Sequence, residues 1–111
     1  MKQPSVLPIT FATRPAVPVA LLALHDEALG AFLAREYRRA LPLLGRLALA
    51  LPFGHGLRPT ARASRARAYL ELGDLDAARR ELALARAAEP ENPMFRVLDI
   101  MLRRAERARA R

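Results

Sequence analysis

The sequence predicts an all-α fold of about five helices, on three observations. Apolar residues recur at three- and four-residue steps from Val19 onward, which is the period of an amphipathic helix. Proline, glycine and asparagine stand where helices begin and end. The 111 residues are 52% hydrophobic but only 5% aromatic, with no Trp, so the core of this single domain must be built from Leu and Ala, which favours closely packed helices.

The first 18 residues differ from the rest of the chain. They contain Pro4, Pro8, Pro15 and Pro18, and each proline removes a backbone donor and disfavours helix at the residue before it. We expect an extended arm over residues 1–18 and one helical domain over 19–111.

Two helices are predicted in the first half of that domain. The first runs from Val19 to about Ala34. The second begins near Tyr37 and ends before Pro52. Pro42 falls inside the second helix, where a proline costs about 3 kcal/mol. Either the first turn of this helix is loose, or the helix begins closer to Pro42.

Three further helices follow a glycine-containing loop at 53–59. Pro59 suits the first turn of the third helix, and Gly73 can end it in the left-handed conformation. Asp74 can then cap a fourth helix, which ends before Pro90. Asn92 followed by proline signals the start of a fifth helix over 93–110.

The chain also contains an internal repeat. Residues 38 positions apart are similar in the segments 33–52 and 70–90. The matched pairs are Tyr37 with Leu75, Ala40 with Ala78, Leu44 with Leu82, Leu47 with Ala85, and Pro52 with Pro90. Such a period indicates a duplicated helical hairpin.

The repeat resembles the tetratricopeptide repeat (TPR) family. The better copy, about 59–92, has family-like residues at Ala66, Tyr69, Gly73, Asp74, Leu75, Ala78, Leu82, Ala85 and Pro90. The weaker copy, about 21–52, has Arg35 in place of the turn glycine. Arg62 and Arg65 occupy sites that the family fills with large apolar residues. The fifth helix then acts as a truncated third unit that caps the array. The alternative is a generic Ala/Leu bundle.

The resemblance implies a partner-binding groove lined by the first helix of each hairpin. The residues carried over to this groove are Leu22, His25, Leu29, Phe32, Leu33, Ala63, Arg67, Leu70 and Glu71. This apolar set suits an extended segment or an amphipathic helix of another protein. The competing interpretation is that Leu29, Phe32 and Leu33 are simply core.

Catalysis and metal binding have little support in the sequence. There is no Cys, and neither His25 nor His55 has a second histidine at metal-binding spacing. Asp26 and Glu27 are adjacent, so their side chains point about 100° apart on a helix. We expect a non-enzyme without cofactor or metal.

The charge suggests a second class of partner. The net charge is +8, and Lys2 is the one lysine among 19 basic residues. Candidate contacts for an anionic partner are Arg58, Arg62, Arg65, Arg103, Arg104 and Arg107. Such a surface can bind nucleic acid without specificity. Few aromatic residues are present for base stacking, so nucleic acid is the less favoured partner.

No apolar run approaches the about 20 residues that span a bilayer, so we expect a cytoplasmic protein without membrane contact. The leading hypothesis is a small bacterial adaptor or chaperone that binds one protein. In size and architecture it resembles the chaperones of type III secretion. Self-association through the fifth helix, giving a homo-oligomer, is a third hypothesis.

Overall fold

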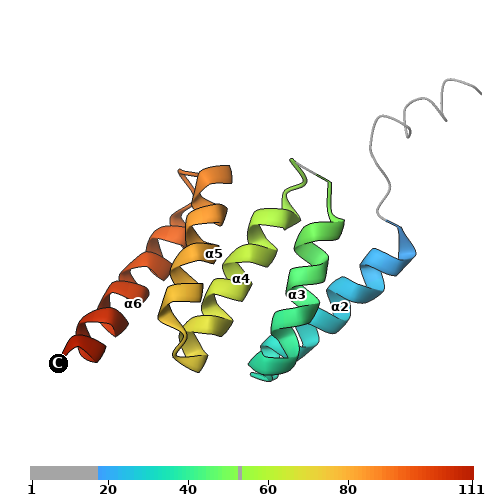
Figure 1. Ribbon diagram of the computed structural model, residues 1–111. Coiled ribbons are helices and arrows are strands. Elements are labelled where there is room, and N and C mark those ends of the chain that lie inside the picture. Colours follow the sequence, from blue (N-terminus) through green and yellow to red (C-terminus); the bar gives the residue numbers. More distant parts are fainter. Residues whose placement is uncertain (1–17, 53) are drawn as a thin grey trace, which may run out of the picture.

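The computed structural model describes residues 18–52 and 54–111 (Figure 1). These residues form five helices and no strand, which confirms the all-α prediction. The helices are α2 (Val19–Leu33), α3 (Tyr37–Ala50), α4 (Leu57–Leu72), α5 (Leu75–Ala88) and α6 (Pro93–Ala110). Of the predicted arm over 1–18, all but Pro18 lies outside the described residues. None of the five helices has the length and hydropathy needed to cross a membrane.

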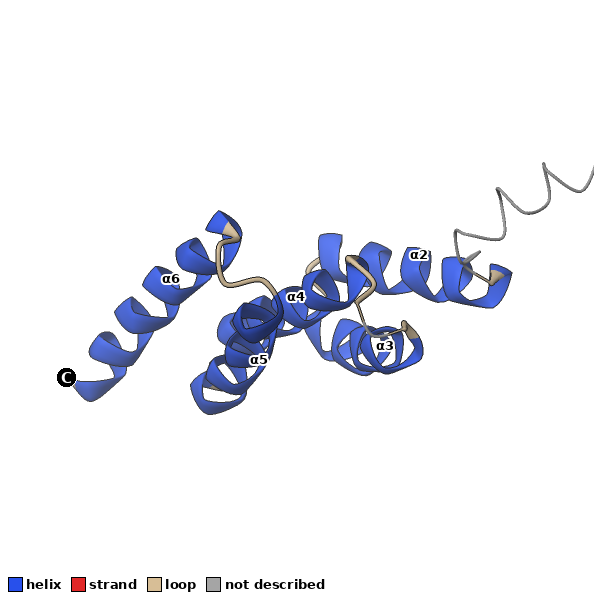
Figure 2. Cartoon of the chain, turned by 90° about the horizontal axis from the view of Figure 1, so that it is seen from above, coloured by secondary structure: helices blue, strands red, loops and turns tan. Residues whose placement is uncertain are grey.

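The helices stand in a row, and neighbours in the chain are neighbours in space. Each helix contacts the next one, and α4 also contacts α6. Viewed along the row, α2, α4 and α6 lie on one side, while α3 and α5 lie on the other (Figure 2). Short links join α2 to α3 and α4 to α5, so each pair forms an antiparallel hairpin.

The two hairpins turn in the same way, although their turn residues differ. Gly73 ends α4 with φ 84°, and Arg35 adopts φ 63° at the matching position after α2. The N–H of Asp74 donates to the carbonyl of Tyr69 at 2.9 Å, and that of Glu36 donates to the carbonyl of Ala31 at 2.9 Å. This six-to-one bond defines a Schellman cap. The 38-residue repeat is therefore also a repeat of backbone geometry.

The predicted caps are present at the starts of α5 and α6. The Asp74 carboxylate accepts from the N–H of Ala77 at 3.2 Å. The Asn92 side chain accepts from the N–H of Met94 at 2.9 Å, with Pro93 opening the helix. Both caps satisfy amides that the helix itself leaves without a partner.

Two predicted helix starts require correction. Helix α3 begins at Tyr37 despite Pro42, and its first turn is closed by an Ala40 N–H bond to the carbonyl of Glu36 at 2.9 Å. Neither a loose first turn nor a start near Pro42 is observed. Helix α4 begins at Leu57, before Pro59, because the Leu57 N–H already donates to Nδ1 of His55 at 3.1 Å.

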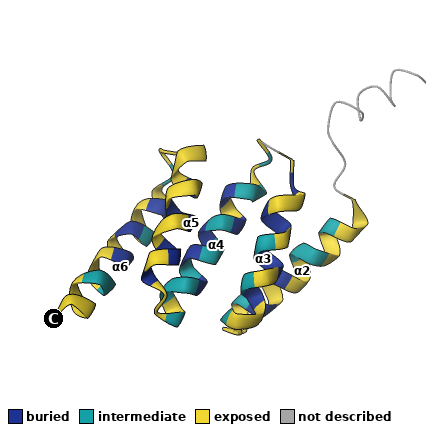
Figure 3. Ribbon diagram, viewed as in Figure 1, coloured by how far each residue is buried: buried dark blue, intermediate teal, exposed yellow. Residues whose placement is uncertain are grey.

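Small residues form much of the core, as the composition predicted. The most closely packed positions are the alanines of the repeat, among them Ala28, Ala40, Ala66, Ala78 and Ala85, all buried (Figure 3). Leu102 of α6 is the largest side chain that is fully buried. With alanine at the contacts, helices can approach closely, and the row holds three adjoining apolar clusters.

Candidate partner-binding groove

A shallow hollow lies between α2 and α4. It has a volume of about 40 Å³. Helix α2 contributes His25, Leu29 and Phe32, and α4 contributes Thr60 and Ser64. Leu44 and Leu47 of α3 also line it and, being buried, form its floor.

A larger hollow continues from it toward α6. Its volume is about 260 Å³. Phe32, Thr60 and Ser64 line this hollow as well as the first, so the two are continuous. The other lining residues are Ala63, Arg67, Asn92, Met94, Phe95 and Leu98. We call the two hollows together the α2/α4/α6 groove.

The chemistry of the groove is apolar with a few polar groups. Ser64 places a hydroxyl in the middle of it, and the Thr60 hydroxyl donates to the carbonyl of Gly56 at 3.3 Å. At one edge, Nε of Arg67 lies 2.8 Å from Oε2 of Glu71. At the other end, Nδ1 of His25 lies 3.5 Å from Oδ1 of Asp26. The charges are therefore largely neutralised within the chain, and the groove offers apolar surface plus hydroxyl groups.

The structure brings together five of the nine predicted groove residues. His25, Leu29 and Phe32 line the first hollow, and Ala63 and Arg67 line the second.

The other four predicted groove residues lie outside it. Leu22 and Leu33 are exposed but line neither hollow. Leu70 packs half-buried against the core cluster of α4 and α5, and Glu71 pairs with Arg67.

The contribution of α6 was not predicted. Met94 and Leu98 line the larger hollow beside Thr60 and Ser64. Each lies 34 positions after its α4 neighbour in this list, so aligning the fifth helix on the third would have found both.

The arginines predicted for an anionic partner divide into three groups. Arg62 and Arg65 are turned inward: Oε1 of the buried Glu81 lies 3.3 Å from Nη1 of Arg62 and 3.4 Å from Nη1 of Arg65. Both guanidinium groups are about one-fifth exposed. They serve the α4–α5 contact and do not form an open basic stripe.

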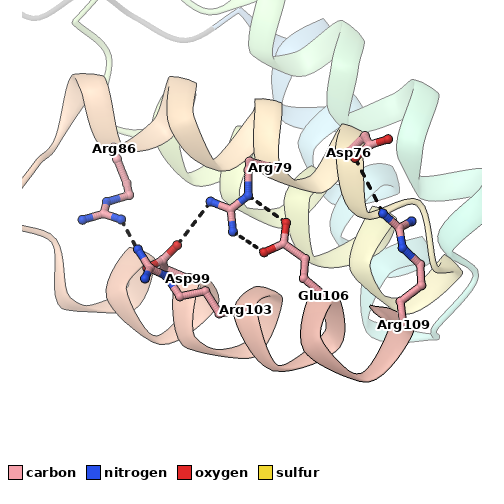
Figure 4. Close-up of polar contacts among 7 residues, drawn as sticks. All are labelled: Asp76, Arg79, Arg86, Asp99, Arg103, Glu106 and Arg109. Atoms are coloured by element: carbon pink, nitrogen blue, oxygen red, sulfur yellow. Dashed lines mark hydrogen bonds and ion pairs between the residues drawn. The ribbon is translucent and has the colours of Figure 1, made fainter. Parts of the chain in front are cut away.

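Arg103 belongs to a network that joins α5 to α6 (Figure 4). The buried Asp99 carboxylate receives Arg103 at 2.9 Å and both Arg79 and Arg86 at 3.6 Å. One turn further along, Arg79 grips Glu106 with two hydrogen bonds of 2.9 and 2.7 Å. The bonds to Glu106 raise the pKa of Arg79, and the same bonds lower the pKa of Glu106.

Arg104 and Arg107 form the third group. Both are exposed on α6, and within residues 18–52 and 54–111 neither takes part in an ion pair. Arg58 lies at the start of α4, where its Nη1 donates to the carbonyl of Leu51 at 3.5 Å. It also lines a separate hollow of about 260 Å³ beside the loop of Gly54 and Gly56.

Metal binding gains no support from this arrangement. Across the described part of the chain, no three His, Asp or Glu side chains gather as a metal site would require. Compared with known proteins, the chain matches no protein-family model, no curated protein and no solved structure.

Proposed function

We propose that the protein is a non-enzymatic interaction module that binds a segment of another protein in the α2/α4/α6 groove. The observation that carries this proposal is the continuity of the two hollows through Phe32, Thr60 and Ser64. Three helices share one apolar channel in which Leu29 and Met94 are exposed to solvent. Surface of this kind is typical of sites for partners.

The occupant that suits the groove is an extended strand or amphipathic helix with two or three apolar anchors. Burial of one Leu or Val side chain stabilises a complex by about 1.5–3 kcal/mol before the costs of association. A few such anchors correspond to a micromolar complex, roughly. This strength suits an adaptor or chaperone that has to release its client. A TPR-like protein of the chaperone type is the form of this function that we favour.

A nucleic-acid role receives less support from the positions of the arginines. Arg62, Arg65, Arg79, Arg86 and Arg103 all face carboxylates of the chain itself. Those guanidinium groups would have to leave their partners before they bound phosphate.

The test is capture of a partner by the immobilised full chain from an extract of its host cells. Leu29→Glu and Thr60→Glu place a charge inside the groove on α2 and α4, and both should abolish capture of any stoichiometric partner. Leu49→Glu is the matched control, because Leu49 is 73% exposed on α3 and lines none of the described hollows. Circular dichroism checks that all three variants are folded.

A photo-crosslinking residue at position 60 should attach to the captured protein, whereas the same residue at position 49 should not. Capture that survives both groove variants, or that Leu49→Glu abolishes equally, would contradict the proposal.

A further inference from the structure

Helix α6 exposes an apolar face that its counterpart α4 has covered. The two helices correspond at a spacing of 34 residues: Ala61 and Phe95 are both buried, and so are Ala68 and Leu102. At this spacing, Ala63 and Ala66 of α4 correspond to Val97 and Ile100 of α6.

The environments of these two pairs differ. Ala63 and Ala66 are buried in one cluster with Leu75, Ala78 and Leu82 of α5. Val97 is 51% exposed and Ile100 is 45% exposed. Helix α6 is last in the row, and none of the described helices lies on its outer side (Figures 1 and 2). Val97 and Ile100 therefore mark the place where a further helix would pack.

The residues of this face follow the spacing of a helix–helix contact. Val97, Ile100, Arg104 and Arg107 recur at three- and four-residue steps and so lie along one line of the helix. We call these four residues the α6 stripe. Met94, 64% exposed, and Met101 flank its apolar half. The stripe is thus apolar toward the start of α6 and basic toward its end.

The missing charge of opposite sign lies just before the helix. Glu91 is exposed, and in the described ranges neither it nor Arg104 nor Arg107 has an ion-pair partner. The acidic and basic groups lie on opposite sides of the apolar pair along the helix. A surface of this kind is complementary to itself when it is turned around.

We propose that a second copy of the chain covers the α6 stripe. The two α6 helices pack antiparallel about a two-fold axis that passes between Val97 and Ile100. Val97 of one protomer then faces Ile100 of its partner, and Arg104 and Arg107 approach Glu91 of the partner. With a rise of 1.5 Å per residue, Glu91 and Arg104 lie about 11 and 8 Å from the axis along the helix. That offset is within reach of an arginine side chain.

A parallel pair is disfavoured, because it would set Arg104 against Arg104 and Arg107 against Arg107. The antiparallel dimer is expected to be weak. Few apolar side chains take part, and a net charge of +8 on each copy opposes association. A dissociation constant of roughly tens to hundreds of micromolar follows for a contact of this size.

The test is sedimentation equilibrium of the full chain from low micromolar to millimolar concentration at physiological salt. The expected result is a monomer–dimer equilibrium. Ile100→Glu should weaken it at least about tenfold, because a symmetric contact carries each substitution twice. Leu49→Glu is the matched control and should leave it unchanged.

Charge reversal tests the orientation. Arg104→Glu and Glu91→Arg should each weaken the dimer, and the double variant should recover most of the loss. The chain has no cysteine, so Ala108→Cys can carry a spin label on the exposed end of α6. The antiparallel pair predicts labels about 30 Å apart, whereas a parallel pair predicts about 10–15 Å.

A chain that stays monomeric to 1 mM overturns the proposal and leaves the face to a helix of another protein. A dimer that Ile100→Glu does not weaken, or that the double variant does not restore, also overturns it. None of these substitutions lies in the α2/α4/α6 groove, so failure here is distinguishable from failure of the proposed function.

Discussion

Arg65 and Glu81 form an ion pair between α4 and α5, with Nη1 of Arg65 3.4 Å from Oε1 of Glu81. The same guanidinium lies over the ring of Tyr69, 5.4 Å from its centroid, and donates to the Tyr69 hydroxyl at 3.1 Å. It also packs against Gly45 of α3. One side chain therefore connects the first hairpin to both helices of the second, at a site where the TPR pattern would have a large apolar residue.

Removing Glu81 should destabilise the fold more than a surface charge would. Glu81→Ala leaves Arg62 and Arg65 partly buried without their counter-charge, so we expect a loss of about 2 kcal/mol in the free energy of unfolding. The triple variant Arg62→Leu, Arg65→Leu and Glu81→Leu should recover that loss, since apolar groups can replace a buried ion network. Urea denaturation measures both. A loss below about 0.5 kcal/mol for Glu81→Ala would place the pair among ordinary surface ion pairs.

The two helical glycines of the first hairpin should respond in opposite ways to the same substitution. A Cβ on Gly45 would lie 3.2 Å from Cζ of Arg65, whereas a Cβ on Gly30 would meet nothing within 4 Å. Gly30→Leu should stabilise the protein by about 0.5–1 kcal/mol through helix propensity. Gly45→Leu should destabilise it by about 1–3 kcal/mol, because Arg65 must move. Thermal unfolding of the two variants side by side checks this. Equal effects would mean that Arg65 yields freely.

Local signals predicted most of the fold, because they act within a few residues. Gly73, Asp74 and Asn92 form the caps that their types favour. The role of Arg62 and Arg65 could not be predicted, because Glu81 lies 19 residues from Arg62 and only packing of the hairpin brings them together. Half of the groove was missed for the same reason, since Met94 and Leu98 reach it through the docking of α6 on α4.

The turn residues of the repeat give a matched pair for a stability test. Arg35 has φ 63°, a conformation that costs an L-residue about 1 kcal/mol or more, and no ion pair of the described chain includes its side chain. Arg35→Gly should therefore raise the melting temperature, by roughly 4 °C for about 1 kcal/mol. Gly73→Ala should lower it by a similar amount, because Gly73 has φ 84°. If Arg35→Gly lowers the melting temperature, the greater freedom of glycine in the unfolded chain outweighs the relief of strain.

The docking of α6 should depend on pH through Glu106. Its hydrogen bonds with Arg79 hold the pKa of this carboxyl below its ordinary value of 4.5. A depressed pKa in the folded state means that the pair stabilises the fold fully above the unfolded-state pKa, and that this stabilisation is lost as the pH falls through the lowered value. Glu106→Gln should therefore unfold at lower urea than the wild type at pH 7, and the two curves should converge at about pH 3.

Two variants serve as controls for this pH dependence. Arg79→Gln in the Glu106→Gln background should add less than Arg79→Gln alone, because the shared hydrogen bonds are already gone. Arg80→Gln removes the neighbouring arginine, which is exposed and has no ion pair in the described chain, so the pH profile should not change. A Glu106→Gln variant that differs from wild type equally at pH 7 and pH 3 would show that the ionised pair does not hold α6 in place.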